Sequence, residues 1–496
     1  RRATHRLDLS KPRSSAGRPP ARPRSRLAVG AVLEGQTPYE IVDGNLVDDA
    51  ADAIAARIDD LRDAVLGVTV MPGPQLEHAL PVCTELKTRL PDLTVVWAGY
   101  FPSQHWDSCL KSPVVDYVVR GHGEHAFAEL LDHLSGDGGS LDGIPGLAYR
   151  DADGEPRSNA LPALPKPDEQ PEWNFDRVPM ERYLRDTFLG RRTVGYASSY
   201  GCPYFCNFCA VVNLVGGTWR AQSAERVAGV FETYHRRWGV DAVELVDNNF
   251  FVDERRVADF SDRVKHLKMA WWGEGRVDTL LRYDDASWRV MRDSGLKMVF
   301  LGAESGSAET LERMDKGGRL APEMTLELVD KLGGLGIVPE LSFVLGNPPD
   351  PEADAVGTMD FIRRVKRLNP STEIILYMYT PVPLAGDLYT AAKARGFAFP
   401  ETLDEWVGPD WLDFVQRRSD TMPWVGRSLQ SRIRHFERVL NAYYPTSTMT
   451  RLTPAKRALL RAASAWRYHL KAYAWPLELD VLHRLMRYQR PETSGF

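Results

Sequence analysis

Apolar and polar residues alternate along residues 27–145 with two different periods. Short runs rich in β-branched and aromatic residues predict strands, at 39–43, 64–70, 93–98 and 114–120. Apolar residues three or four positions apart predict helices between them, at 27–33, 48–62, 75–90 and 124–134. Strands that alternate with helices are typical of a doubly wound parallel sheet. We therefore predict a Rossmann-like α/β domain over residues 27–145, with ligands at the carboxyl ends of its strands.

The same alternation begins again at residue 193 and repeats six times. The predicted strands are short apolar runs, at 193–198, 242–247, 269–272, 297–303, 338–345 and 372–380. The predicted helices lie between and after them, at 223–238, 254–267, 285–294, 307–315, 322–335 and 354–368. Six β-α units predict a partial (β/α)6 TIM barrel over residues 193–388, a fold whose chemistry takes place at the carboxyl ends of the strands.

Three segments lie outside these two patterns. Residues 1–26 are rich in Arg, Pro and Ser without an apolar period, so we expect a disordered basic tail. Residues 146–192 predict a small hairpin followed by a Pro-rich linker. Residues 389–496 predict a helical C-terminal region that includes a basic and aromatic run at 456–475. That run is compatible with a membrane surface, but we favour a cap whose aromatic side chains pack on the barrel.

Composition narrows the class of protein. A chain of 496 residues with 43% hydrophobic residues is long enough for two or three domains. Its net charge of −5 gives no reason to propose nucleic acid as a partner. Five cysteines are too few for a disulfide-rich secreted protein, and no apolar run approaches the ~18 residues of a membrane span. We therefore expect a cytoplasmic protein.

Three of the five cysteines lie close together, directly after the first predicted strand of the barrel. Cys202, Cys206 and Cys209 follow one another at positions i, i+4 and i+7, with Gly201 and Pro203 beside the first. Iron–sulfur clusters are normally held by four thiolates, so a run of three leaves one iron open. The alternatives are a chance grouping and a zinc site, but zinc requires four ligands and the chain has no second cysteine pair.

The spacing C-x3-C-x2-C, with the aromatic Phe208 before the last cysteine, resembles the signature of the radical S-adenosylmethionine (SAM) enzymes. The resemblance implies that Cys202, Cys206 and Cys209 hold a [4Fe-4S] cluster whose open iron binds the amino and carboxylate groups of SAM. Such enzymes cleave SAM to a 5′-deoxyadenosyl radical. They take the electron from a donor such as flavodoxin or ferredoxin, and the oxygen-sensitive cluster agrees with a cytoplasmic location.

The ends of the other barrel strands resemble the SAM-binding motifs of the same family. Asp247 resembles the residue that contacts the amino group of SAM, and Arg276, followed by Asp278, resembles the residue that pairs with its carboxylate. Glu304 and Ser305 belong to a G-x-E-S-G motif suited to ribose hydroxyls. The resemblance extends the set of SAM-binding residues to Phe208 and Tyr379. Each charged residue could equally form an ion pair at the barrel rim.

The first domain resembles the cobalamin-binding domain that precedes the barrel in one large radical SAM subfamily. The resemblance rests on 97–100 and on the loop Gly121-His122-Gly123-Glu124, and it implies cobalamin contacts from Gly99, Gly121, Gly123 and Glu124. Members usually read G-E-G-E at this loop, so His122 is a departure. Members also begin with an apolar strand, which the Arg- and Pro-rich residues 1–26 do not provide. We therefore expect the first strand to be missing, altered or replaced.

Together these resemblances imply a cobalamin-dependent radical SAM enzyme that methylates an unactivated carbon of a small-molecule substrate, of natural-product or lipid-like type. One alternative within the subfamily is a cyclase or ring-rearranging oxidoreductase that transfers no methyl group. An alternative of another class is a non-catalytic binding protein on a degenerate fold, against which the three intact cysteines argue. The sequence identifies no catalytic acid or base.

Overall fold

The computed structural model describes residues 5–8, 23–58, 64–316, 320–383, 386–415, 423–446, 448, 452–486 and 488. Its N-terminal part is a seven-stranded sheet in the order β2 (Tyr39–Ile41), β1 (His5–Asp8), β3 (Val65–Thr69), β4 (Thr94–Ala98), β5 (Tyr117–Val119), β6 (Leu147–Arg150) and β7 (Pro156–Ser158). The first five strands of this order are parallel, whereas β6 and β7 form an antiparallel hairpin added at the edge. The predicted hairpin of residues 146–192 therefore extends the sheet.

Helices cover both faces of this sheet, as a doubly wound fold requires. The helices are α1 (Arg24–Leu33), α2 (Ala50–Ile58), α3 (Pro74–Arg89), α4 (Tyr100–Gln104), α5 (Trp106–Leu110) and α6 (Glu124–Leu134). Apolar residues of α1 and α6 pack with Val65, Val96 and Val119 on one face. Residues of α2, α3 and α5 pack with Leu66 and Trp97 on the other. The prediction of a Rossmann-like domain is confirmed.

The expectation that residues 1–26 are disordered is wrong for the described part of that segment, and of the alternatives for the first strand (missing, altered or replaced) the first is excluded. Strand β1 lies between β2 and β3, and its Leu7 is in parallel register with Ile41 and with Gly67. Helix α1 begins at Arg24. A strand of four residues with one aliphatic residue in its sequence has no apolar pattern to detect. Residues 1–4 and 9–22 lie outside the described residues.

The second sheet contains the six predicted barrel strands, all parallel. Their order is β15 (Glu373–Met378), β14 (Val338–Leu345), β13 (Leu296–Glu304), β12 (Ala270–Gly275), β11 (Ala242–Leu245) and β8 (Thr193–Tyr196). The connecting helices are α8 (Ala224–Trp238), α9 (Glu254–Val264), α10 (Val277–Leu280), α11 (Asp285–Asp293), α12 (Ala308–Arg313), α13 (Pro322–Leu335) and α14 (Pro351–Leu368). Since β8 and β15 each pair with one neighbour among the described strands, the barrel is partial, as predicted.

One small antiparallel ribbon was not predicted. Strand β9 (Ser199–Gly201) pairs with β10 (Trp219–Ala221), and the short helix α7 (Val211–Val215) lies between them. Gly201 has a φ of 75°, and a Cβ there would lie 2.2 Å from the carbonyl oxygen of Thr218. The ribbon therefore requires glycine at this position, directly before the first cysteine.

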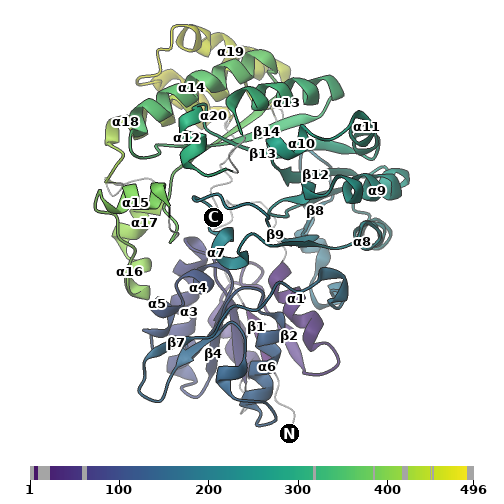
Figure 1. Ribbon diagram of the computed structural model, residues 1–496, viewed down its shortest axis with the longest axis vertical. Coiled ribbons are helices and arrows are strands. Elements are labelled where there is room, and N and C mark those ends of the chain that lie inside the picture. The colour runs from purple at the N-terminus through teal and green to yellow at the C-terminus, as the bar shows by residue number, and fades with distance from the viewer. Residues whose placement is uncertain are drawn as a thin grey trace.

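The two sheets are joined by elements that cross between them. Leu27 of α1 is buried in the core of the barrel. In the other direction Leu403 and Trp406, in α16 (Leu403–Trp406), are buried in the core of the first domain. Figure 1 shows α16 beside α5, with α7 and β9 between the two sheets. The C-terminal helices therefore hold the first domain against the barrel, which the sequence did not reveal.

The remaining C-terminal helices lie against the barrel. They are α15 (Asp387–Lys393), α17 (Pro409–Val415), α18 (Arg427–Tyr443), α19 (Pro454–His469) and α20 (Leu477–Met486). Leu460, Tyr468 and Leu479 belong to the barrel core, so the predicted packing of this region on the barrel is present. Within the described ranges, no helix has both the length and the apolar character needed to cross a membrane.

Candidate functional site

The cysteine loop begins at the carboxyl end of β9 and is fixed to the barrel on its far side. The backbone N–H of Asn207 donates to the carbonyl of Met314 at 3.1 Å, and its side-chain amide donates to the carbonyl of Arg313 at 2.6 Å. Cys206 is buried, while Cys202 and Cys209 are partly exposed. The loop is thus held by backbone and amide contacts that do not involve the three sulfur atoms.

The three thiols lie near one another and near cationic groups. Burial raises the pKa of Cys209 to about 12, and the negative charges of Cys206 and Cys202 add to that rise. Burial also raises the pKa of Cys206, which Lys316 and Arg276 oppose. The guanidinium of Arg276 donates to the sulfur of Cys206 at 3.4 Å. These raised pKa values mean that the thiols lose their protons only when a bound cation stabilises the thiolates. A metal can supply that charge, because ligation to metal requires the deprotonated form.

The donor set fits an iron–sulfur cluster better than a single ion. Among the described residues, no group of three or more His, Cys, Asp or Glu side chains is placed to hold one metal ion. A [4Fe-4S] cluster binds each thiolate to a different iron, so its cysteines need only surround a shared volume. The electrostatic coupling of all three cysteines agrees with that arrangement.

Asp247 lies at the carboxyl end of β11 with one side-chain oxygen fully used and the other free. Its Oδ1 accepts from the backbone N–H and hydroxyl of Ser198, at 3.0 and 2.9 Å, and from the hydroxyl of Ser199 at 2.5 Å. Its Oδ2 is buried and has no hydrogen-bond partner in the described structure. Burial raises the pKa of Asp247, and Arg256 opposes the rise. A buried carboxylate oxygen without a donor is a fitting acceptor for a ligand ammonium group.

Arg276 is fully engaged by the protein. It forms a bidentate pair with Asp278, at 3.0 and 3.2 Å, and donates to the carbonyl of Lys316 at 2.5 Å. Its guanidinium also lies 3.7 Å above the ring of Tyr204. To pair with the SAM carboxylate, as predicted, Arg276 would have to divide its guanidinium between that carboxylate and Asp278. In the structure Arg276 instead places positive charge beside Cys206.

Lys316 belongs to the site and was missed by the sequence reasoning. It is 4% exposed, and its ammonium group bonds to the Glu304 carboxylate and to the carbonyl of Gly302. A Cβ on Gly302 would lie 2.1 Å from that carboxylate and 2.5 Å from the ammonium group, so the glycine makes room for the pair. The only local signal was a lysine directly before two glycines.

The three remaining predicted SAM residues differ in what they contact. The hydroxyl of Ser305 bonds to Asp354 at 3.1 Å and to Thr358 at 3.1 Å, both in α14. It therefore anchors the strand end to a helix in this structure. Tyr379 is 1% exposed, and its hydroxyl has no partner among the described atoms, which leaves it available to a ligand. Phe208 packs against the barrel core.

Carboxylates also line the barrel interior beneath this rim. Trp271 packs in the helix-facing core, so Trp272 and Glu274 face the interior. The indole of Trp272 donates to Glu340 at 2.8 Å. Burial, together with the charges of Asp247 and Glu340, raises the pKa of Glu274 to about 8. Glu274 is thus a carboxyl group that keeps its proton near neutral pH.

The predicted cobalamin loops form one connected rim on the first domain. Gly99 and Gly121 have φ angles of 101° and 70°, which favour glycine. The hydroxyl of Ser103 joins the loops, because it donates to the carbonyl of Gly99 at 2.6 Å and accepts from the N–H of Gly121 at 2.9 Å. A Cβ at Gly123 would lie 2.3 Å from Val119. These loops lie at strand ends and are lined by backbone atoms. Such loops allow a bulky cofactor to approach closely.

The two rims face each other across the domain boundary. The ring of His122 lies 4.3 Å from that of Tyr200, two residues before Cys202. On the other side of the loop, burial raises the pKa of Tyr100, and the negative charge of Cys209 adds to that rise. Gln104 donates to the carbonyl of Ala210 at 3.1 Å. His122, the departure from the usual loop sequence, therefore lies at this boundary.

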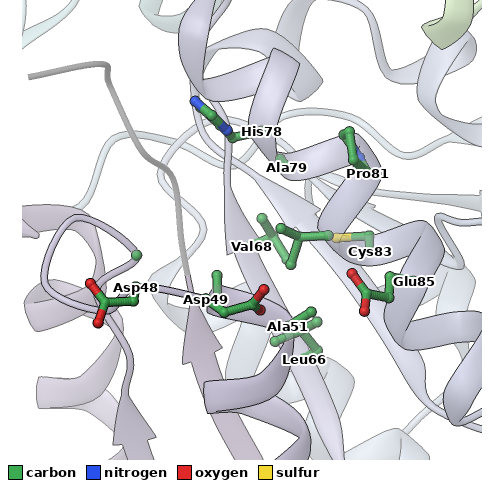
Figure 2. A pocket seen from close by; sticks show the side chains of 13 residues that line it. Asp48, Asp49, Ala51, Leu66, Val68, His78, Ala79, Pro81, Cys83 and Glu85 are labelled. Carbon is green, nitrogen blue, oxygen red and sulfur yellow. The ribbon is translucent and has the colours of Figure 1, made fainter.

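The structure has a cavity in the first domain and another beside the cysteine loop. One, of about 200 Å³, lies between α2 and α3, with Leu66 and Val68 at its floor and Asp49 and Glu85 at its edge (Figure 2). It is smaller than typical ligand pockets and lies on the face of the sheet that α2 and α3 cover. The other, of about 460 Å³, is lined by Phe205 and Asn207 of the cysteine loop and by residues of α12. The second cavity therefore adjoins the cysteine loop.

Sequence comparison finds a family model that matches a segment of each domain. Residues 21–131 match the B12 binding domain, and residues 196–362 match the radical SAM superfamily. An uncharacterized methyltransferase of Pyrococcus horikoshii is 29% identical over 343 residues, which are 68% of this chain and 72% of that protein. The anaerobic magnesium-protoporphyrin IX monomethyl ester cyclase of Synechocystis is 26% identical over 349 residues, 68% of this chain and 65% of that protein.

Among solved structures, the cobalamin-dependent SAM radical enzyme OxsB with aqua-cobalamin and SAM bound has a TM-score of 0.68 at 16% identity. The alignment covers 99% of this chain and 76% of that one. At this level of identity the likeness concerns the fold. Both domains and their order along the chain are therefore shared with that protein.

Proposed function

The chain belongs to the radical SAM enzymes that carry a B12-binding domain, and we propose that it methylates an unactivated carbon of a small-molecule substrate. When bound, the cluster and SAM supply a 5′-deoxyadenosyl radical and cobalamin supplies a methyl group. The cofactors carry the difficult chemistry, and the protein binds, orients and shields them. A natural-product or lipid-like substrate fits a site that lies between two domains.

Each cofactor has a set of residues to hold it. Cys202, Cys206 and Cys209 would hold the cluster, while Arg276 and Lys316 balance the thiolate charge. For SAM, the free Oδ2 of Asp247 would accept from the ammonium group, and the hydroxyl of Tyr379 is a further available contact. The Gly99 and Gly121 loops would bind cobalamin. Glu274 is a protonated carboxyl group inside the barrel that could hold or move a proton.

One observation carries this proposal: the rim of the first domain faces the rim of the barrel. Tyr100 of the first domain lies near Cys209, and the ring of His122 contacts that of Tyr200 at a tilted angle. Cofactors bound at both rims would therefore act on one substrate between them.

The test is an anaerobic assay of the reconstituted protein with cobalamin, a strong reductant and SAM carrying a labelled methyl group. We expect both 5′-deoxyadenosine and S-adenosylhomocysteine, measured by mass spectrometry, and loss of the deoxyadenosine in Cys206→Ala. Substrate candidates should gain one labelled methyl group. A protein that binds iron and cobalamin and yet forms neither product with any candidate substrate would contradict the proposal.

A second candidate is a cyclase or oxidoreductase that transfers no methyl group. It is favoured by one observation, the similarity to the Synechocystis cyclase over 68% of the chain. The same assay separates the two, because this reaction would form 5′-deoxyadenosine without S-adenosylhomocysteine. In either case we propose that an electron donor of the flavodoxin or ferredoxin type reduces the cluster.

A further inference from the structure

The last two helices that the structure describes, α19 and α20, carry a second apolar face that points away from the barrel. Nine large hydrophobic side chains are exposed in the part of the chain that the structure describes, and seven of them lie between residues 459 and 485. The seven are Leu459, Trp466, Leu470, Trp475, Leu477, Val481 and Leu485, with exposed fractions from 51% for Trp466 to 76% for Leu485. We call this set the α19–α20 apolar surface.

The spacing shows that this surface follows the helices. Leu459, Trp466 and Leu470 are seven and four positions apart along α19 and its end, and Leu477, Val481 and Leu485 are four apart along α20. The inner faces of the same helices are already used, because Leu460, Tyr468 and Leu479 are buried in the apolar cluster that continues from the barrel into the C-terminal helices. Single exposed apolar residues are normal, whereas a concentration of this kind marks an interaction site.

Charge indicates what covers the surface. Residues 454–486 contain six Lys and Arg but two Asp and Glu, in a chain whose net charge is −5. Both acidic residues are paired, Glu478 with Arg467 and Asp480 with Arg438. Lys456 and Arg484 are exposed. A basic, apolar and Trp-containing face is complementary to an anionic surface that also accepts apolar groups.

We propose that the α19–α20 apolar surface docks on an anionic lipid bilayer, with the helices lying in the plane of its surface. A second copy of the chain is a poorer occupant, because a symmetric pair would bring two basic segments together. Figure 1 shows α19 at the end of the molecule opposite the first domain, so docking there leaves the boundary between the two sheets accessible. The proposal is independent of the reaction catalysed.

The test is flotation of the full-length, cofactor-loaded protein with vesicles of phosphatidylcholine alone or mixed with phosphatidylglycerol. We expect binding to the anionic vesicles that weakens with salt. Leu470→Ser combined with Trp475→Ser should weaken binding about tenfold, and Lys456→Gln combined with Arg484→Gln by a similar factor. Leu368→Ser, an exposed leucine at the end of α14 outside the surface, is the matched control and should bind normally.

Circular dichroism checks that the variants fold. If the Leu470→Ser and Trp475→Ser double variant does not fold, the single Trp475→Ser variant takes its place, together with a salt titration of wild-type binding. Absence of binding to anionic vesicles, or equal binding by the Leu470→Ser and Trp475→Ser protein, would overturn the proposal. It would also be overturned by a dimer in light scattering that these substitutions convert to a monomer without any vesicle binding. That result would assign the surface to a second copy.

Discussion

The rim of the barrel and the rim of the first domain meet at one boundary but are built in opposite ways. The barrel rim consists of buried charges that bond to one another, such as Arg276 with Asp278 and Lys316 with Glu304. The rim of the first domain consists of glycine-containing loops, joined by the hydroxyl of Ser103. If the cofactors bind as proposed, the barrel rim would hold its ligands through side-chain chemistry and the first-domain rim through the shape of its backbone.

This difference predicts opposite sensitivities. Removing a side chain from the barrel rim leaves a buried charge without its partner, which is costly. The first-domain rim has few side chains to lose, and there the damaging change is to add one. The following predictions test that contrast, from the largest expected effect to the smallest.

The largest effect is expected at the cysteine loop. Cys206→Ala should abolish cluster assembly, because the loop supplies three thiolates and no fourth cysteine lies near it in sequence. Iron content and the visible absorbance of the reconstituted protein measure the loss, and cobalamin binding should persist. Cys83→Ala, which removes a buried cysteine of the first domain, is the control. A Cys206→Ala protein with a full complement of iron would disprove the assignment.

A large effect on stability is expected at the buried pair of the barrel rim. Lys316→Met should lower the free energy of unfolding by about 3 kcal/mol, because it leaves the Glu304 carboxylate buried without a cation. Adding Glu304→Gln should recover much of the loss, a coupling that denaturant titration of the single and double variants measures. If the two substitutions are simply additive, the pair does not act as a unit.

A smaller and selective effect is expected at the first-domain rim. Gly99 has a φ of 101°, and a Cβ there would lie 3.0 Å from Thr69 and 3.1 Å from the carbonyl of Val70. Gly99→Ala should weaken cobalamin binding about tenfold through strain in this loop, with the cluster intact. Gly229→Ala in α8, where a Cβ meets open space, is the control. Equal cobalamin affinity in both variants would remove Gly99 from the binding rim.

The smallest effect is expected where the C-terminal region holds the first domain. His105 lies 4.4 Å from Trp406, measured between ring centroids, and burial lowers its pKa from 6.5 to about 4. The unfolded chain therefore binds a proton below pH 6.5 that the folded protein does not take up until about pH 4. Stability from this residue is complete above pH 6.5 and declines as the pH falls toward 4.

We expect a loss of about 1 to 2 kcal/mol between pH 7 and pH 4.5, after allowance for partial solvent exposure. Melting temperatures across this range should fall less for His105→Phe than for the wild type. Parallel curves for the two proteins would show that His105 does not set the pH dependence.

Much of this architecture could be predicted from the sequence because its signals are local. The six barrel strands were found as apolar runs, and the cysteine loop by its spacing. Strand β1 could not be found, because a short strand held by its neighbours has no apolar period. The insertion of Trp406 into the core of the first domain is a contact between distant segments, which no local pattern encodes.

The residue types of the candidate site could be named from the sequence, whereas the groups to which each residue bonds could not. Asp247 and Tyr379 keep a free polar atom, as a ligand-binding residue should. Ser305 matched a motif, but its hydroxyl bonds to α14. Lys316 had no motif of its own, because its role follows from the room that Gly302 leaves for its pair with Glu304. Such roles depend on packing in three dimensions.

The most direct test of the facing rims is electron paramagnetic resonance of the protein loaded with cob(II)alamin and the cluster. If both cofactors bind at the rims described, the unpaired electron of the reduced cluster should broaden the cob(II)alamin signal and speed its relaxation. Oxidation of the cluster, or Cys206→Ala, should restore the narrow signal. A cob(II)alamin signal that is identical with reduced and oxidised cluster would contradict the account, because the two cofactors would then lie too far apart to act on one substrate.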